Sequence, residues 1–518
     1  MRMKLSLSFL LLWTATITGF CQAPPGSPPT APKADVIKPL IRETTTIDWE
    51  PSVVTIDVRK KTYDYFQPWT TPSQSFQKFG TILAKNQILT TAENLSDKTL
   101  LRIQKEGRGK WNIGEIAWVD YHANLALITV ADEKFWTGLK PVTLAPHAKT
   151  TDPLRLVRWR TGKLEVRSAE FNQFTVEEGK ISFAQYVHME ASSEINGAGW
   201  GEPLVAGGQV LGITSYQNGN SCKVIPSSFI NDVLQAAKSA NYRGLGYFDF
   251  VWQNSENNTL LEYLKLKGDQ RGVVIIEPPT HGDTNSIKSH DVILSIDGFA
   301  IDTSGDYVDP EYGHLMLENL ATRKHWAGDK VKLGLWRDGK EVSVDYEIPK
   351  VDYMTHLVPD EIFDQPPQYY MVGGLVFQPL TDMYLRSWGA DWKRRAPFRL
   401  NYYNNEPQTK ERPFLVLLSQ VLPDSANLGY QDYRFMVVDK VNGKKISVLQ
   451  DIEEALKNPQ NGFQVFEFMK GDNLQKLVMD AGEAKLATER ILARYGIEKD
   501  KVFGTPTPEK AASALTAK

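Results

Sequence analysis

Most of the side chains that could act as nucleophile or base lie in one short stretch of the chain, residues 188–193. Ser192 and Ser193 closely follow His188 and Glu190, and His122 lies further upstream. A hydroxyl beside an imidazole is the pairing that hydrolases use to form a covalent intermediate, so these residues are the candidates for a displaced hydrolytic site. Such residues are also common on ordinary strands and loops, and we expect both histidines to be surface or hydrogen-bonded residues.

The eight histidines of the chain show no H-E-x-x-H motif and no clustered spacing of metal ligands. We therefore expect neither a metal site nor a cofactor.

Three other segments form a frame from which reactive residues are missing. They are ILTTAENL (88–95), DYHANLAL (120–127) and INGAGWGEPL (195–204). In order and separation they resemble the catalytic segments of the HtrA/Deg-type, trypsin-like serine proteases, which run roughly I-L-T-N-A-H-V-V, D-x-x-x-D-L-A-L and I-N-P-G-N-S-G-G-P-L. The resemblance places Glu93 at the histidine position, Asn124 at the aspartate position and Trp200 at the serine position.

None of these three residues can take the role that its position has in the family. The chemistry needs a hydroxyl nucleophile, an imidazole base and a carboxylate that orients the base. Trp200 offers only an indole N–H donor. Glu93, with a reference pKa of about 4.3, is a poor base for a hydroxyl near neutral pH, and Asn124 carries no charge. Glu202 adds a carboxylate near the oxyanion-binding loop, where it would oppose a developing oxyanion.

The elements that must position these segments are short strands. From Pro51 to Phe229 the chain consists of strand-like runs separated by Gly, Asn, Asp and Pro, which favours an all-β barrel or sandwich. The resemblance implies a mainly β chain, with a trypsin-like double β-barrel followed by two PDZ-like α+β domains. Apolar residues at helical spacing over 225–240 predict the helix that leaves the protease domain.

The stretch 242–351 resembles a PDZ domain, because YRGLGYFDF is similar to the carboxylate-binding loop of that family and GVVIIEPP and KSHDVILSIDGFAI to later strands. One departure is His290, where the turn usually has glycine. The resemblance implies that a peptide terminus binds in a nest of backbone N–H groups and pairs with the following strand. The implied peptide-binding residues are Gly244, Leu245, Gly246, Tyr247, Phe248 and Phe250. A groove closed by the chain itself is the alternative.

A second, more diverged unit resembles the second PDZ domain of plant-type Deg proteases. Its matching loop comprises Gly373, Gly374, Leu375, Val376 and Phe377. We favour packing or an oligomer contact over peptide capture there. The same unit contains RSWGADWKRRAP, a basic insertion with two tryptophans. The aromatic segment YDYFQPW (63–69) suits the trimer contact of the family, and a core or lid role suits it equally.

The beginning of the chain predicts export. MRMK followed by an apolar run is typical of a secretory signal, and the Pro/Ala-rich stretch after it is typical of a linker. Cleavage is expected near residue 22, and the bulky Phe20 before Cys21 speaks against lipidation. With Cys21 in the signal, Cys222 has no intramolecular disulfide partner. We expect a secreted, periplasmic protein, with the cell exterior as the alternative, and no integral membrane span after cleavage.

The formal net charge of −3 gives no bulk electrostatic reason to expect nucleic acid or an anionic membrane as partner. The expected partners are polypeptides or protein C-termini, and the family resemblance adds a trimer-based homo-oligomer or a hetero-oligomer with active paralogues. The function hypothesis is a pseudoprotease that binds polypeptides as scaffold, chaperone-like binder or regulator of protein quality control. The alternatives are an active serine-type hydrolase with displaced residues and a structural envelope protein.

The expected organisation has six parts along the chain. They are a signal peptide (1–22), a linker (23–45), a trypsin-like pseudoprotease domain (46–240), a first PDZ domain (241–351), a diverged PDZ-like domain (352–482) and a C-terminal helix and tail (483–518).

Overall fold

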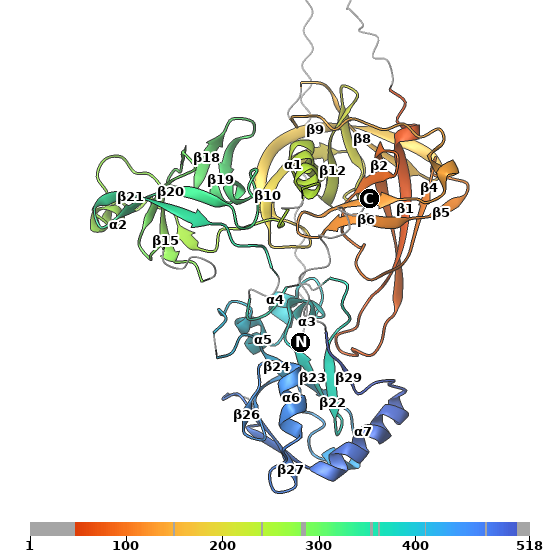
Figure 1. Ribbon diagram of the computed structural model, residues 1–518, viewed down its shortest axis with the longest axis vertical. Coiled ribbons are helices and arrows are strands. Elements are labelled where there is room, and N and C mark those ends of the chain that lie inside the picture. The colour runs from red at the N-terminus through yellow and green to blue at the C-terminus, as the bar shows by residue number, and fades with distance from the viewer. Residues whose placement is uncertain are drawn as a thin grey trace, which may run out of the picture. The chain divides into compact units, whose positions relative to one another are not determined.

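A computed structural model describes residues 47–148, 151–239, 242–280, 286–352, 356–360, 363–409, 411–471 and 474–504. The predicted signal peptide and linker, and the end of the predicted tail, lie outside these residues. The described chain is mainly β, which confirms the predicted fold class (Figure 1). The described residues from Asp48 onward belong to one compact unit.

The first part is a seven-stranded antiparallel sheet with the order β5-β4-β1-β2-β3-β7-β6. Its strands are β1 (Val53–Lys61), β2 (Ser73–Ala84), β3 (Gln87–Thr90), β4 (Lys98–Gln104), β5 (Trp111–Ile113), β6 (Glu115–Asp120) and β7 (Leu125–Thr129), with short 3-10 helices η1 (Glu50–Ser52) and η2 (Glu133–Trp136). Val54, Ile56 and Val58 of β1 are buried in one core, as the alternation of side chains along a strand requires.

The second part closes into a six-stranded barrel with the order β10-β13-β12-β11-β8-β9. Its strands are β8 (Leu154–Arg160), β9 (Lys163–Glu178), β10 (Gln185–Ser193), β11 (Pro203–Ala206), β12 (Gln209–Asn218) and β13 (Ser221–Pro226). The helix expected over 225–240 is α1 (Ser227–Ala237), whose buried Phe229, Ile230 and Val233 face the barrel. The segments with Glu93, Asn124 and Trp200 lie in the connections of these two parts.

The third part is formed by the first PDZ-like stretch, residues 242–351. A sheet with the order β14-β15-β16-β20-β21 and a separate hairpin are built from β14 (Val251–Gln253), β15 (Val273–Glu277), β16 (Val292–Ile296), β17 (Phe299–Ala300), β18 (Asp306–Asp309), β19 (Gly313–Met316), β20 (Lys330–Arg337) and β21 (Lys340–Glu347). The helices are α2 (Asn258–Tyr263) and the 3-10 helix η3 (Leu317–Ala321). His290 adopts φ 70°, so the turn keeps the left-handed conformation that glycine usually supplies there.

The C-terminal part is a sheet with the order β28-β27-β25-β24-β23-β22-β29. Its strands are β22 (Tyr369–Val372), β23 (Leu375–Pro379), β24 (Val416–Val421), β25 (Met436–Val441), β26 (Lys444–Lys445), β27 (Phe463–Phe468), β28 (Lys476–Asp480) and β29 (Lys501–Val502). Its helices are α3 (Asp382–Arg386), α4 (Trp392–Arg395), α5 (Phe398–Tyr403), η5 (Ser425–Asn427), α6 (Leu449–Leu456) and α7 (Ala481–Tyr495).

The domain boundary expected at residue 482 falls inside α7. This helix packs on β22 and β28, and β29 then pairs with β22. Ile491 and Ile497 are buried with Tyr369 and Met371, so the helix belongs to the C-terminal sheet. None of the helices within the described ranges is long and apolar enough to cross a membrane.

Candidate functional site

The fold brings the three triad-position residues close together. Glu93 follows β3, Asn124 precedes β7 and Trp200 lies between β10 and β11. The backbone N–H of Glu93 donates to Oδ1 of Asn124 at 3.0 Å. Lys180 links Glu93 to Trp200, because its Nζ lies 2.9 Å from Oε1 of Glu93 and 4.7 Å from the centroid of the Trp200 ring. A serine protease would have its nucleophile, base and orienting carboxylate at this place.

Two polar atoms of this group are buried and have no hydrogen-bond partner among the described residues. They are Oε2 of Glu93 and Nδ2 of Asn124. Sequence reasoning missed Lys180, since no motif marks a lone lysine in a loop. Its ammonium also lies 5.4 Å from the ring centroid of Tyr216, so one cation contacts two aromatic rings and one carboxylate.

A second cation, Lys78 on β2, is completely buried beneath the same turn. Its Nζ donates to the carbonyl oxygens of Thr91, at 2.6 Å, and of Glu93. Burial lowers the pKa of Lys78 to about 7, although the charge of Glu93 acts in the opposite direction. The turn that carries Glu93 is therefore anchored by a lysine that gives up its proton easily.

This anchor makes stability depend on pH. The unfolded chain holds the lysine proton up to about pH 10.5, and the folded chain loses it near pH 7. Between these values the unfolded state binds more protons, so stability must rise with pH. We expect the free energy of unfolding of the wild type, compared with Lys78→Met, to increase by about 2 kcal/mol between about pH 7 and about pH 9.

Urea unfolding at the two pH values tests this expectation. The control is Lys85→Met, because Lys85 is exposed and should follow the wild type. The same pH slope for Lys78→Met and the wild type would show that Lys78 does not titrate in this range.

The backbone amides next to the serine position already have acceptors. Glu202 is completely buried, and its Oε2 accepts the N–H groups of Gly199 at 3.0 Å and Trp200 at 2.8 Å, together with the hydroxyl of Thr214. The N–H of Ala198 donates to Oε1 of Gln217 at 2.6 Å.

This arrangement refines the sequence-based expectation. Glu202 was expected to oppose an oxyanion from nearby, and in the structure its carboxylate takes up the donors that an oxyanion would need. Gln217 was missed, because only the fold brings β12 against the segment that carries Ala198. The N–H groups of this loop are thus occupied, while Oε1 of Glu202 is buried without a hydrogen-bond partner among the described residues.

The residues considered for a displaced hydrolytic site are mostly engaged elsewhere. Nδ1 of the buried His188 lies 3.0 Å from the carbonyl oxygen of Tyr186, and burial lowers the pKa of His188 to about 4. Ser192 exchanges hydrogen bonds with Asn172, and Glu190 pairs with Lys223. Ser193 is buried, and its hydroxyl accepts the N–H of Ile195.

His122 contacts the hydroxyl of a serine that sequence reasoning did not select. Nδ1 of His122 lies 2.8 Å from Oγ of Ser182. Burial lowers the pKa of His122, so its imidazole is neutral at neutral pH. Ser182 also accepts the N–H of Ala184.

The glycine-containing loop of the first PDZ-like part is tied to the end of its own sheet. Tyr247 donates its N–H to the carbonyl oxygen of Pro349 at 3.2 Å, and Val351 donates to the carbonyl oxygen of Leu245 at 2.9 Å. Leu245 itself is buried. Gly246 forms an isolated bridge with Lys350. The loop therefore has a fixed backbone.

The strand expected over Phe248 to Phe250 begins later, at Val251. Phe248 and Phe250 stack on each other with ring centroids 5.2 Å apart, and both contact Tyr346. The three residues of β14 pair with β15 alone, so β14 is an edge strand with Val251 48% exposed. An edge strand is what an added peptide strand needs.

Two cations flank this loop. Arg243 precedes Gly244, and the Cε of Lys350 lies 3.7 Å from the point where a side chain on Gly244 would begin. The Arg243 guanidinium pairs with Asp329 at its other side. Positive charge beside a glycine turn favours a carboxylate ligand.

The matching loop of the C-terminal part is covered by its own chain. Gly373 and Gly374 form the turn between β22 and β23. The N–H of Gly373 donates to Oγ1 of Thr488 on α7, and its carbonyl oxygen accepts from Nδ2 of Asn427, both at 2.8 Å. Leu375, Val376 and Phe377 are fully buried. This loop packs against helices, and the N–H of Gly373 is already engaged.

The aromatic segment 63–69 contacts the C-terminal part of the same chain. Phe66 lies edge-on to Trp388 with ring centroids 4.8 Å apart, and Trp69 lies edge-on to Tyr369 at 6.1 Å. Nε2 of Gln420 donates to the carbonyl oxygen of Phe66. Of the roles considered for this segment, the structure gives it an internal packing role, so these faces of Phe66 and Trp69 are not available to a second copy.

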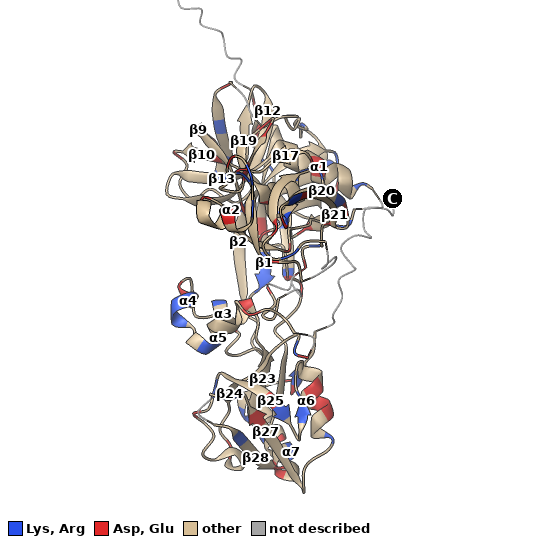
Figure 2. Cartoon of the chain, turned by 90° about the vertical axis from the view of Figure 1, so that its left-hand side faces the viewer, with Lys and Arg blue, Asp and Glu red and all other residues tan. Residues whose placement is uncertain are grey.

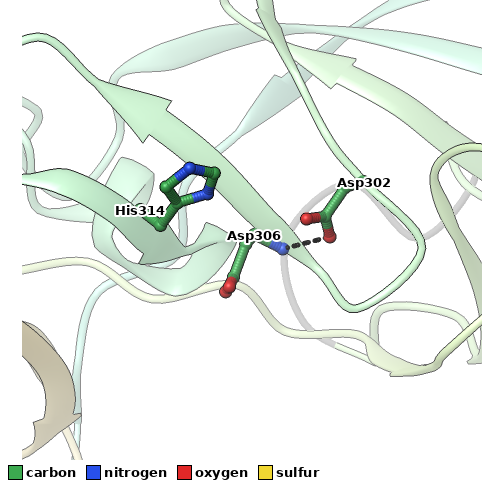
Figure 3. Close-up of side chains that lie close together, drawn as sticks. All are labelled: Asp302, Asp306 and His314. Atoms are coloured by element: carbon green, nitrogen blue, oxygen red, sulfur yellow. Dashed lines mark hydrogen bonds between the residues drawn. The ribbon is translucent and has the colours of Figure 1, made fainter.

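Asp302, Asp306 and His314 form the one group of potential metal ligands found in the described ranges (Figure 3). Oδ1 of Asp302 accepts the N–H groups of Ser304 at 2.8 Å and Asp306 at 2.9 Å, so this carboxylate caps the turn before β18. Asp302 and His314 are exposed, and no other feature at this turn points to an ion. We assign no metal to it.

Comparison with known proteins gives three kinds of similarity. Residues 358–502 match the model of a PDZ domain family. The putative protease Do-like 13 of Arabidopsis thaliana is 24% identical over 462 residues, covering 86% of this chain and 87% of that protein. The chloroplastic protease Do-like 2 of the same plant is 24% identical over 455 residues, covering 85% of this chain and 72% of that protein.

Solved structures of HtrA-type proteases are also similar to parts of the chain. The HtrA-type protease AlgW with a decapeptide is 17% identical, with a TM-score of 0.42, and the match covers 58% of this chain and 95% of that one. The PDZ match extends to residue 502 and includes all of α7. The chain is a homologue of the Do-like, HtrA-type serine proteases and carries a PDZ domain in its C-terminal part.

Proposed function

We propose that this chain is an exported pseudoprotease of the HtrA type, which binds polypeptide ends through its first PDZ-like part and acts as a scaffold or chaperone-like binder in protein quality control. The observation that carries the loss of catalysis is the closed network at the serine position. Trp200 replaces the nucleophile, and Glu202 accepts the amides around it. A protein that has lost both the nucleophile and the oxyanion donors retains only its binding surfaces.

Peptide binding is supported by the geometry of the first PDZ-like part. Its loop is held in place by hydrogen bonds, two cations flank it, and the edge strand β14 follows it. Because Pro349 already accepts the N–H of Tyr247, a carboxylate would bind the other amides of the loop. In the second loop Thr488 accepts the N–H of Gly373 and Asn427 donates to the carbonyl oxygen of Gly373, so this loop supports packing instead. The export and the periplasmic location rest on the amino-terminal sequence. An oligomer built on the family's trimer, alone or with active paralogues, belongs to the same proposal.

The charge beside the loop gives a direct test. The probe is the fluorescein-labelled peptide Ala-Ala-Leu-Val, with either a free or an amidated C-terminus. We expect the free acid to bind and the amide to bind much more weakly, because the nest receives a carboxylate. Lys350→Glu should weaken binding of the free acid about tenfold, since an attraction becomes a repulsion of similar size. Fluorescence anisotropy measures both.

The matched control is Lys340→Glu, at the other end of β21, which should bind like the wild type. If neither peptide binds in any variant, the groove is occluded and a structural envelope protein becomes the better interpretation. If the amide binds as tightly as the acid, the loop does not receive a carboxylate.

An active hydrolase is the second candidate, and the contact between Ser182 and His122 is the observation that favours it. A fluorophosphonate probe would then label the wild type and not Ser182→Ala. We expect no labelling of either protein, because Oγ of Ser182 is held by the N–H of Ala184 and no carboxylate accepts a hydrogen bond from His122 within the described ranges.

A further inference from the structure

The basic, aromatic insertion of the C-terminal part folds into three short helices, α3, α4 and α5. They lie between β23 and β24 and form a group beside the sheet (Figure 1). One side of the group is a core, in which Leu385, Trp392 and Leu400 are buried. This core fixes the orientation of the helices, so the residues on the opposite side have a defined position.

The opposite side exposes two large aromatic rings. Phe398, at the start of α5, is 83% exposed, and Tyr402, one turn later, is 52% exposed. Their ring centroids are 6.4 Å apart, so they form one patch. The hydroxyl of Tyr402 donates a hydrogen bond to the carboxylate of Glu406. Exposing a phenylalanine ring to water loses the free energy that its burial would provide. Two exposed rings side by side on a helix with a fixed orientation therefore indicate a contact surface.

Basic side chains are concentrated in the segment that carries these rings. The 22 residues from 382 to 403 contain five basic and two acidic side chains, whereas the whole chain has a formal charge of −3. Lys393, Arg394 and Arg395 are consecutive and exposed, and the α3–α5 group shows this concentration of basic residues (Figure 2). Of the two acids, Asp382 is buried against Arg386, and Asp391 lies 3.7 Å from Arg394. The segment therefore carries an excess of positive charge, of which Lys393 and Arg386 also act on Glu178 outside the segment.

We propose that this face, formed by Lys393, Arg394, Arg395, Phe398 and Tyr402, docks on the surface of an anionic phospholipid membrane. Aromatic rings favour the interfacial region of a bilayer, and each basic side chain near an anionic surface adds attraction. The local positive charge of this face complements an anionic lipid surface, although the net charge of the whole chain is negative. The proposed export also favours a membrane over a nucleic acid as the source of phosphate groups.

Vesicle co-sedimentation tests the proposal on the chain that begins at residue 24, which lacks the predicted signal. The probes are vesicles of phosphatidylcholine with and without phosphatidylglycerol. We expect binding only to vesicles with the anionic lipid. The triple variant K393Q/R394Q/R395Q should bind on the order of a hundredfold more weakly. Phe398→Ser should bind about tenfold more weakly at unchanged charge.

Two control variants carry the same kinds of change at exposed sites elsewhere. They are K163Q/K340Q/K476Q for charge and Tyr263→Ser, which removes a tyrosine that is 76% exposed on α2. Both should bind like the wild type. Circular dichroism checks that all variants fold.

Several outcomes would overturn the proposal. One is equal binding to both kinds of vesicle by every variant. Another is an unchanged vesicle affinity together with a loss of binding to a single-stranded oligonucleotide in the K393Q/R394Q/R395Q and Phe398→Ser variants. A third is vesicle binding unaffected by these changes while light scattering shows that they abolish self-association. None of these results bears on the peptide site, so the proposed function stands or falls separately.

Discussion

Restoring the three triad residues alone should leave the protein inactive. We expect the variant E93H/N124D/W200S to show no cleavage of casein, and the same variant with Glu202→Gly added to cleave at least about a hundredfold faster. The physical reason is that the buried Glu202 carboxylate holds the N–H groups of Gly199 and Trp200. The tetrahedral intermediate needs such donors for its oxyanion, and removal of a single donor in a protease costs about 100-fold to 1000-fold in rate.

Gln217 should interfere less. Its neutral amide accepts a single N–H group, from Ala198, and can turn aside at the cost of about 1 kcal/mol. A buried carboxylate that accepts three hydrogen bonds cannot turn aside so easily. The substitution to glycine also restores the residue that the family motif has at this position.

The control for this experiment is Glu194→Gly in the triple variant. Glu194 lies on the same segment but is exposed, so its removal changes the charge without freeing an amide. Casein cleavage by the triple variant alone would show that Glu202 leaves the oxyanion donors accessible. Cleavage by the wild type would contradict the proposed loss of catalysis and direct attention to Ser182.

The sequence was sufficient to find the three triad positions of the protease part, but not the residues that contact them from other loops and strands. Glu93, Asn124 and Trp200 were found because the residues around them keep a linear motif, and the fold then brings them together. Lys180 and Gln217 complete the same site from other loops and strands. Their roles depend on which loops meet in space, and no local pattern encodes that.

The role of segment 63–69 could not be predicted for a similar reason. The segment 63–69 was left open among several roles, and its partner Gln420 lies 354 residues away in the sequence. Long-range packing of this kind is invisible to periodicity. By contrast, the assignment of α7 to the C-terminal sheet was accessible, because Ala484, Ala487 and Ile491 are apolar at helical spacing and are buried. A helix with such a stripe must cover something.

The second large effect is expected at the turn that α7 covers. Gly374 has φ 88°, and a side chain there would begin 2.3 Å from the carbonyl oxygen of Leu422 and 2.8 Å from Cδ1 of Ile491. Gly374→Ala therefore combines backbone strain with a collision against groups that cannot move freely. We expect it to lower the local stability of the β22–β23 hairpin by about 3 kcal/mol or more, measured by amide hydrogen exchange.

The matched control is Gly496→Ala, at the end of the same helix. Gly496 has φ 64°, and nothing lies within 4 Å of an added side chain, so this variant carries the backbone strain alone. It should lower stability by about 1 kcal/mol. A large effect at Gly374 and a small one at Gly496 would show that the turn is tightly packed between Leu422, Asn427 and Ile491 of α7. Equal effects would mean that α7 lies loosely over this turn, and its glycine loop would again be a candidate for peptide capture.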